Sequence, residues 1–250
     1  MKAMILAAGE GTRLRPLTFD HPKPMLPLAG KPVLEHLIGW LCAHDVQDIA
    51  INLHYRPRAV TDYFGDGRAW GVRLTYSVEE TLLGTAGAVR RLDRFFDEPF
   101  VVVYGDLLTD VDLGALVSFH RRAVAQDSRT LGTLALYRVP DPAAAGIVEV
   151  DDTGRIRRFV EKPRPGEIVG NLANAGIYVL EPATVAAIPP DTRYDFGRDL
   201  FPQLLADGAS LYGVPITEYL LDIGTLEKYR QAEADIAAGR VRLAGEARVC

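Results

Sequence analysis

The chain alternates short runs of Val, Ile, Leu and Ala with segments of helical periodicity, and this alternation constrains its fold most. Apolar runs without a polar face fit strands that are buried on both sides, and intervening helices supply the crossovers of a parallel sheet. Strands are predicted over 3–8, 48–53, 72–78 and 100–104, and helices over 33–44, 58–64 and 87–95. The pattern predicts an α/β fold: a single Rossmann-like three-layer α/β/α domain with a mixed, mostly parallel sheet.

The second half of the chain is richer in predicted strands. Residues 147–150 and 155–160 are predicted to form a hairpin, because the segment between them is polar and contains glycine. Other strands are predicted over 130–139, 175–180, 210–216 and 218–223, and a last helix over 226–238. Because no linker or repeat interrupts the chain, we expect one domain over 1–240, with a strand-rich lobe over 111–240, and a C-terminal tail over 241–250.

A glycine-rich loop with fixed cations follows the first predicted strand. Gly9 and Gly11 leave room for backbone N–H groups to approach anionic oxygens, and Arg13 follows closely. Lys23 stands between two prolines, which restrict the backbone and so fix where its ammonium points. A tight turn that merely needs two glycines explains the loop alone equally well, but the added cations favour a phosphate site. The loop lacks the third glycine of a dinucleotide fingerprint and the Gly-Lys-Ser/Thr of a P-loop.

Composition and charge narrow the partners. A net charge of −5 argues against nucleic acid, which usually requires a basic face. The two cysteines, Cys42 and Cys250, are too few for a disulfide framework or a zinc cluster, and Cys42 falls in the apolar pattern of a helix. The N-terminal apolar run is too short for a signal peptide or a membrane span. We expect a cytoplasmic protein without nucleic-acid or membrane partners.

Several motifs spread along the chain resemble one enzyme family. The most specific are LAAGEGTRLRPLT at 6–18 and PKPMLP at 22–27. They are accompanied by LGTAGA at 83–88, YGD at 104–106, GIVE at 146–149, FVEKP at 159–163, NAGIY at 174–178 and DIGT at 222–225. Together these motifs resemble the sugar-1-phosphate nucleotidyltransferases, also called nucleotide-sugar pyrophosphorylases. The chain departs from the family at Leu220, where many members carry a tryptophan that bears on packing against the sugar ring.

The resemblance implies a reaction between two anions. A phosphate oxygen of a sugar 1-phosphate would attack the α-phosphorus of a nucleoside triphosphate, and pyrophosphate would leave in line. Because the nucleophile is already charged, positioning and electrostatics supply most of the catalysis. The resemblance further implies a nucleotide-binding half over about 1–110 and a sugar-phosphate-binding half over 111–240, in a homodimer or a homotetramer.

The resemblance assigns roles to cations and carboxylates. Arg13 would grip the triphosphate and the departing pyrophosphate, Lys23 would neutralise the α-phosphate, and Lys162 the sugar phosphate. Asp106 and Asp222, each at the end of an apolar strand, would hold Mg²⁺ together with phosphate oxygens; the alternative is a turn or cap role. The remaining expected nucleotide contacts, largely through main chain, are Leu6, Ala7, Ala8, Gly9, Gly11, Thr12, Glu79, Gly84 and Thr85.

On the sugar side, the resemblance points to Gly146, Glu161, Lys162 and Asn174. Glu161 would accept hydrogen bonds from sugar hydroxyls, or it would form an ion pair with Lys162 or an arginine. Gly146 would let the backbone approach the sugar, or it would simply begin a strand. Asn174 could offer a hydroxyl both a donor and an acceptor. The segment 194–199 could line the sugar pocket or close a crossing loop.

The base loop favours a guanylyltransferase. LGTAG looks more like the enzymes that act on mannose 1-phosphate or a heptose 1-phosphate, so GTP and mannose 1-phosphate giving GDP-mannose are the expected substrates and product. The alternatives are a glucose-1-phosphate thymidylyl- or uridylyltransferase, a cytidylyltransferase for a small phosphorylated alcohol, and a silent regulator that binds nucleotide sugars. The intact cation and carboxylate set argues against the regulator. The position of the last helix predicts no β-helix extension.

Overall fold

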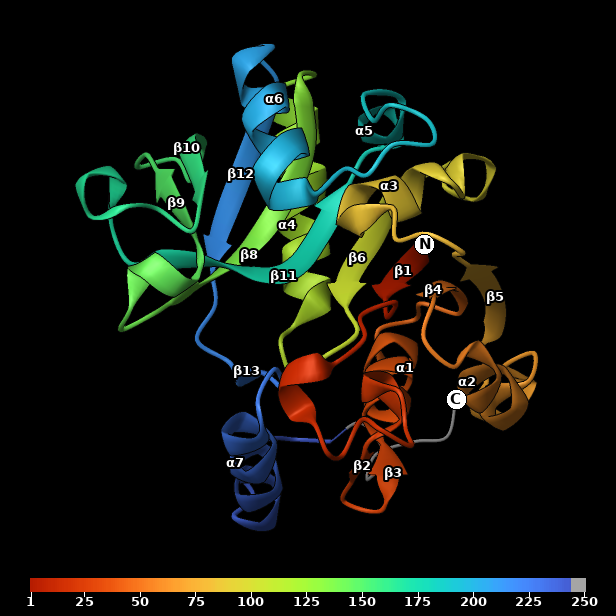
Figure 1. Ribbon diagram of the computed structural model, residues 1–250. Helices are drawn as coiled ribbons and strands as arrows, with labels where there is room; N and C mark the ends of the chain where they lie inside the picture. The colour runs from red at the N-terminus through yellow and green to blue at the C-terminus, as the bar shows by residue number, and fades with distance from the viewer. Residues whose placement is uncertain (244–250) are drawn as a thin grey trace. The chain divides into compact units, whose positions relative to one another are not determined.

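The computed structural model describes residues 1–243, and the chain divides into two compact units (Figure 1). The first unit comprises residues 1–82, 103–111 and those from 218 onward, and the second comprises 83–102 and 112–217. The first unit thus takes segments from both predicted halves of the chain. Most of the predicted tail, from residue 244 onward, lies outside the described residues.

Three parallel strands form the sheet of the first unit. β1 (Lys2–Leu6) pairs with β4 (Asp48–Leu53), which in turn pairs with β5 (Arg73–Val78). β4 is buried along almost its whole length, as expected for a strand covered on both faces. The three strands lie at the ranges predicted from the sequence, 3–8, 48–53 and 72–78. The next strand along the chain, β6 (Phe100–Tyr104), is followed by Gly105, whose amide donates to the carbonyl of Leu6 at 2.9 Å.

Two helices of the first unit begin and end close to their predicted bounds. α1 (Val33–Ala43) buries the predicted apolar face and also Trp40 and Cys42, which confirms Cys42 as a core residue. Trp40 Nε1 donates to the carbonyl of Val111 at 2.9 Å, so α1 is tied to the segment that follows β6. α2 (Pro57–Phe64) stops at Gly65, as the sequence predicts.

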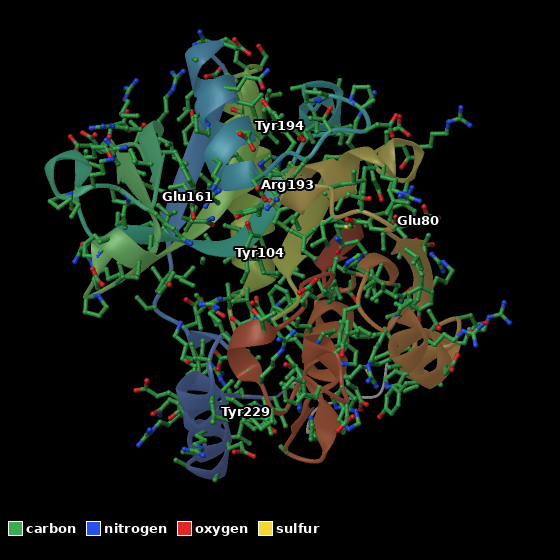
Figure 2. All side chains as sticks on the ribbon, viewed as in Figure 1. Glu80, Tyr104, Glu161, Arg193, Tyr194 and Tyr229 are labelled. Atoms are coloured by element: carbon green, nitrogen blue, oxygen red, sulfur yellow. The ribbon has the colours of Figure 1, made fainter. Side chains whose placement is uncertain are left out.

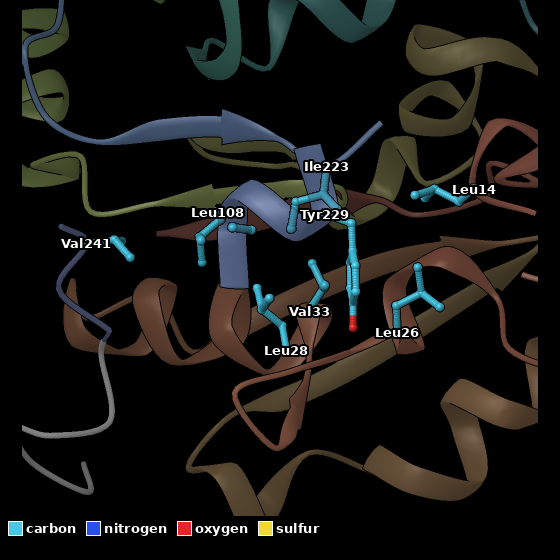
Figure 3. Packing of buried hydrophobic residues seen from close by; sticks show 9 residues of the cluster. Leu14, Leu26, Leu28, Val33, Leu108, Ile223, Tyr229 and Val241 are labelled. Carbon is cyan, nitrogen blue, oxygen red and sulfur yellow. The ribbon is translucent and has the colours of Figure 1, made fainter. Parts of the chain in front are cut away.

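Short strands and the last helix complete the first unit. β2 (Pro27–Leu28) pairs with β3 (Lys31–Pro32), β7 (Leu107–Thr109) pairs antiparallel with β13 (Leu220–Asp222), and α7 (Leu226–Ala237) follows. Apolar side chains of these elements and of other segments of the first unit form one cluster (Figure 3): Leu14, Leu26, Leu28, Val33, Leu108, Ile223, Tyr229, Ala232 and Val241. The hydroxyl of Tyr229 also donates to the carbonyl of Pro27. This core anchors both the glycine-rich loop, through Leu14, and the segment that carries Asp222, through Ile223.

The second unit is mainly antiparallel. β8 (Thr130–Arg138) pairs with β11 (Leu172–Leu180) antiparallel and with β12 (Ser210–Pro215) parallel. β9 (Gly146–Val150) and β10 (Ile156–Glu161) form the predicted hairpin, and β9 also pairs with β11. Parallel and antiparallel pairings combined with helices confirm an α/β fold with a mixed sheet.

The helices of the second unit are α3 (Gly84–Arg90), α4 (Leu113–Gln126), α5 (Ala183–Ala186) and α6 (Phe201–Ala206). The helix predicted over 87–95 begins earlier, at Gly84, and a separate 3₁₀ turn covers Asp93–Phe95. The sequence analysis missed α4, because the buried side of this helix includes a polar residue, His120. The two ring nitrogens of His120 are hydrogen-bonded to Thr133 and Glu181, each at 3.0 Å. No described helix is both long and apolar enough to cross a membrane.

Candidate active site

The glycine-rich loop begins directly after β1, and a hydrogen bond and burial fix the position of its first residues. The amide of Ala7 donates to Asn52 Oδ1 at 2.8 Å, and Ala7 and Ala8 are buried. Gly9 and Glu10 are exposed, and a Cβ added to Gly9 would meet no atom of the described residues within 4 Å. The loop therefore passes from a fixed, buried start to an open tip.

Gly11 closes the loop and requires glycine. Its φ of +66° is strained for other residues, and an added Cβ would lie 3.0 Å from Thr18 Cγ2 and 3.1 Å from Lys23 Cβ. The hydroxyl of Thr18 donates to the carbonyl of Gly11 at 2.8 Å. Loop closure thereby brings Lys23 next to the glycines.

Arg13 lies in a short 3₁₀ turn, Thr12–Leu14, whose Leu14 is fully buried in the core cluster. A Cβ added to Gly224 would lie 3.4 Å from Arg13 Nη2 and 2.8 Å from Asp222 Oδ1. The guanidinium of Arg13 and the carboxylate of Asp222 thus lie against the same glycine. The predicted roles of Arg13 and Asp222 therefore fall on side chains that lie near one residue of the first unit.

Asp106 and Asp222 come together through the pairing of β7 with β13. Asp222 lies opposite Leu107, and the amide of Ile223 donates to the carbonyl of Asp106 at 2.8 Å. Burial raises the pKa of Asp222, and the nearby charge of Asp106 raises it further. The two carboxylates predicted to share a cation are therefore neighbours that interact electrostatically.

Each of these aspartates has a lysine beside it. Lys23 Nζ forms an ion pair with Asp106 Oδ2, and Lys228 Nζ lies 3.4 Å from Asp222 Oδ2. The sequence analysis gave Lys228 no role. The only signal that could have marked it is the scarcity of lysine, since Lys228 is one of five lysines among 28 basic residues.

The carboxylate pair fits a hard divalent cation. Asp222 Oδ1 is buried and has no hydrogen-bond partner among the residues that the structure describes. Such an orphaned anionic oxygen is costly unless a cation satisfies it. Within residues 1–243, no group of three or more His, Cys, Asp or Glu side chains could hold a metal ion. The pair would therefore need oxygens from a substrate or water to complete an octahedral shell.

Asn52 joins the loop to Glu79 and was missed by the sequence analysis. Its Oδ1 accepts from the amide of Ala7, and its Nδ2 donates to Glu79 Oε1 at 2.8 Å. Glu79 is only 2% exposed, so its carboxylate faces the protein interior. Its main chain is also engaged, because its amide donates to the carbonyl of Leu53 and its own carbonyl lies 2.8 Å from His54 Nδ1. A polar residue inside the apolar strand β4 is the signal that could have found Asn52.

The predicted base loop of the second unit is held by the segment 194–196. The amides of Ala86 and Gly87 donate at 2.9 and 3.0 Å to the carbonyl of Tyr194, which Figure 2 labels. Thr85 donates to Asp195 through both its amide and its hydroxyl. The segment that the sequence left open therefore supports the base loop. The hydroxyl of Thr85 is engaged inside the protein.

Replacing Gly84 by Ala is expected to lower the free energy of unfolding by about 2 kcal/mol. Its φ is +74°, and an added Cβ would lie 2.6 Å from the carbonyl oxygen of Tyr194. Urea unfolding checks this, with Gly166→Ala as the control, because a Cβ there meets nothing within 4 Å in residues 1–243. Equal stability of the two variants would contradict the close approach.

Glu161 is wedged between two glycines of the second unit. A Cβ added to Gly146 or Gly197 would lie 2.6 or 2.8 Å from Glu161 Oε2. Burial raises the pKa of Glu161, and the charges of Lys162 and Arg198 oppose that rise. Among the described residues no ion pair engages the Glu161 carboxylate, so it can still accept hydrogen bonds. Gly146 thus makes room for Glu161, a function that the sequence analysis did not consider.

Lys162 and Asn174 are positioned by unusual backbone. Lys162 has a positive φ of 51°, and its amide donates to the carbonyl of Ala145 at 3.0 Å. The residue is exposed. Asn174 lies in β11 beside a register shift, where its Nδ2 donates to Tyr178 and its Oδ1 accepts from the amide of Gly176. Asn174 therefore keeps only its second donor and acceptor sites for a ligand.

Comparison with known proteins identifies the family of the chain. The nucleotidyl transferase family model matches residues 2–239. The UTP–glucose-1-phosphate uridylyltransferase of Synechocystis sp. is 38% identical over 97% of this chain and 65% of its own length. The mannose-1-phosphate guanylyltransferase of Mycobacterium tuberculosis is 38% identical over 95% of this chain and 65% of its own length. The chain thus spans slightly less than two thirds of these relatives.

Solved structures show the same fold. A candidate glucose-1-phosphate thymidylyltransferase from Bacillus anthracis, crystallised with sucrose, is similar with a TM-score of 0.82 at 27% identity, and 94% of each chain is covered. The match of the family model to nearly the whole described chain, together with this likeness, leaves one conclusion. The chain belongs to the nucleotidyl transferase family.

Proposed function

We propose that the protein is a sugar-1-phosphate nucleotidyltransferase, which joins a nucleoside triphosphate to a sugar 1-phosphate and releases pyrophosphate. The observation that carries this proposal is the gathering of Arg13, Lys23 and the Asp106–Asp222 pair in one unit. Cations together with paired carboxylates suit two phosphorylated substrates better than a neutral ligand. Family membership and the two relatives at 38% identity support the same reaction.

The chain's own residues would bind and align the reacting groups. A sugar-phosphate oxygen would form the new P–O bond at the α-phosphorus while the bond to the pyrophosphate oxygen breaks, so no protein base need accept a proton. Arg13 would stabilise charge on the leaving pyrophosphate, and Lys23 would neutralise the α-phosphate. Glu161 and Lys162 would orient the sugar and its phosphate. Mg²⁺, held by Asp106 and Asp222, would supply further neutralisation of phosphate oxygens.

The substrate pair we propose is GTP and mannose 1-phosphate. The LGTAG loop and the mannose-1-phosphate guanylyltransferase relative favour it. A second candidate, UTP and glucose 1-phosphate, is favoured by the uridylyltransferase relative at the same identity. The test is a pyrophosphate-release panel that crosses the common nucleoside triphosphates with several sugar 1-phosphates, with and without Mg²⁺. Release with no pair of substrates would contradict the enzyme and favour a regulator. A cytoplasmic location and a homodimer or homotetramer stay predictions.

Replacing Arg13 by Ala is expected to lower turnover about 100-fold, the usual loss when one donor to developing charge is removed. The Michaelis constant for the sugar 1-phosphate should change little, because Arg13 is assigned to the triphosphate. Steady-state kinetics measure both values. Arg68→Ala is the matched control, since Arg68 is an exposed arginine of the same unit that pairs with Asp66. Equal effects on turnover and sugar-phosphate binding would contradict the assignment.

A further inference from the structure

The first turn of α7 places a cation where helices disfavour one. Lys228 is the third residue of α7, and its amide donates to Thr225 Oγ1, the N-cap, at 3.3 Å. The free N–H groups of a helix N-terminus carry partial positive charge, so a lysine there is normally unfavourable. The anion that compensates is Asp222, whose Oδ2 lies 3.4 Å from Lys228 Nζ. Backbone and side chain thus both hold Lys228 against this carboxylate.

The carboxylate pair and its lysines balance in charge. Lys23 is paired with Asp106 and Lys228 with Asp222, so two ammonium groups face two carboxylates. The two carboxylate oxygens of Asp222 differ in their contacts. Oδ2 accepts a hydrogen bond from Lys228, whereas the buried Oδ1 has no hydrogen-bond partner among the described residues. A divalent cation that binds this pair would therefore bind Asp222 while that carboxylate is already paired with the ammonium of Lys228.

We propose that Lys228 is an internal counter-ion that competes with a divalent cation for Asp222, so that cation binding releases the ammonium. This inference rests on the proposed function, since it takes Asp106 and Asp222 as the metal site. A cation between the aspartates adds positive charge beside Lys23 and Lys228, and a polyanionic nucleotide offsets that charge. Lys228 thereby makes cation binding depend on the nucleotide.

The competing interpretation is an ordinary surface ion pair. The side chains of Lys228 and Asp222 are 44% and 40% exposed, and pairs with such exposure contribute little to stability. An ordinary pair predicts that loss of Lys228 leaves cation affinity unchanged. A competing counter-ion predicts a gain in affinity, which a damaged fold would not produce.

The test titrates Mn²⁺ into the full chain after chelator treatment and measures free Mn²⁺ by electron paramagnetic resonance, without nucleotide. Lys228→Met should bind Mn²⁺ about five- to ten-fold more tightly than wild type, because one nearby positive charge is removed. Lys228→Arg keeps the charge and should match wild type. Lys31→Met is the matched control, since it breaks a lysine ion pair with Glu35 (3.2 Å) on α1 and should also match wild type.

A second titration adds a non-hydrolysable GTP analogue. The nucleotide should tighten Mn²⁺ binding less in Lys228→Met than in wild type. Unchanged or weaker Mn²⁺ binding by Lys228→Met would overturn the proposal that Lys228 competes with the cation for Asp222. Failure of the metal site itself looks different: neither wild type nor Lys228→Met would then bind Mn²⁺ in a way that Asp222→Asn abolishes, with or without nucleotide, and both proposals would fall.

Discussion

Replacing Asp222 by Asn is expected to reduce turnover by at least about 100-fold, because the variant loses one of two charged ligands for the metal. Stability should not fall with it. Burial and the charge of Asp106 raise the pKa of Asp222, so the folded protein disfavours this carboxylate at neutral pH and a neutral amide removes that cost. Pyrophosphate release and urea unfolding, measured on the same preparation, check the two expectations.

Asp66→Asn is the matched control for this experiment. Asp66 is an exposed aspartate of the same unit whose partner is Arg68. Its loss should leave both turnover and stability near wild type. Turnover of Asp222→Asn within about a factor of two of wild type would remove Asp222 from the metal site. A large loss of stability instead would make Asp222 a structural residue.

Replacing Asn52 by Leu is expected to cost about 3 kcal/mol of unfolding free energy. The reason is that the change removes two buried hydrogen bonds, one from the amide of Ala7 and one to the carboxylate of Glu79, each 2.8 Å long. Because Ala7 begins the glycine-rich loop, the Michaelis constant for the nucleotide should also rise. Urea unfolding and steady-state kinetics measure the two effects.

The control for Asn52→Leu is Asn171→Leu. Asn171 is exposed and contacts Arg138 through its side chain at 2.9 Å, so the same substitution there leaves no buried group unpaired. Its stability should stay within about 0.5 kcal/mol of wild type. If both variants lose the same stability, the buried network around Asn52 contributes nothing beyond an ordinary surface contact.

The strands could be predicted best where burial is complete on both faces. The buried parts of β1 and β6 are uninterrupted apolar runs, that of β4 is interrupted only by Asn52, and no helical pattern competes with them. The predicted start of α3 was wrong. Glycine is typical of loops, so the sequence placed Gly84 outside the helix, whereas in the structure the helix begins there and the amides of Ala86 and Gly87 donate to the carbonyl of Tyr194. α4 was missed because the polar His120 interrupts its buried stripe.

The candidate site shows the same division. The loop with Gly11, Arg13 and Lys23 is local in sequence, so its motif alone indicates phosphate chemistry. Asp106 and Asp222 could be named from the family resemblance, but no sequence pattern states that β7 pairs with β13. That pairing makes them neighbours and leaves Asp222 Oδ1 buried without a partner among the described residues.

By itself the sequence determined the α/β class, the buried strands, and the kinds of donor and acceptor available for chemistry, because periodicity and motif are properties of neighbouring residues. Only the tertiary structure decided that Asn52 fixes the loop, that segment 194–196 supports the base loop and that Lys228 sits on Asp222. These contacts join side chains to segments far along the chain or across a turn, and strand pairing and core packing alone set their distances.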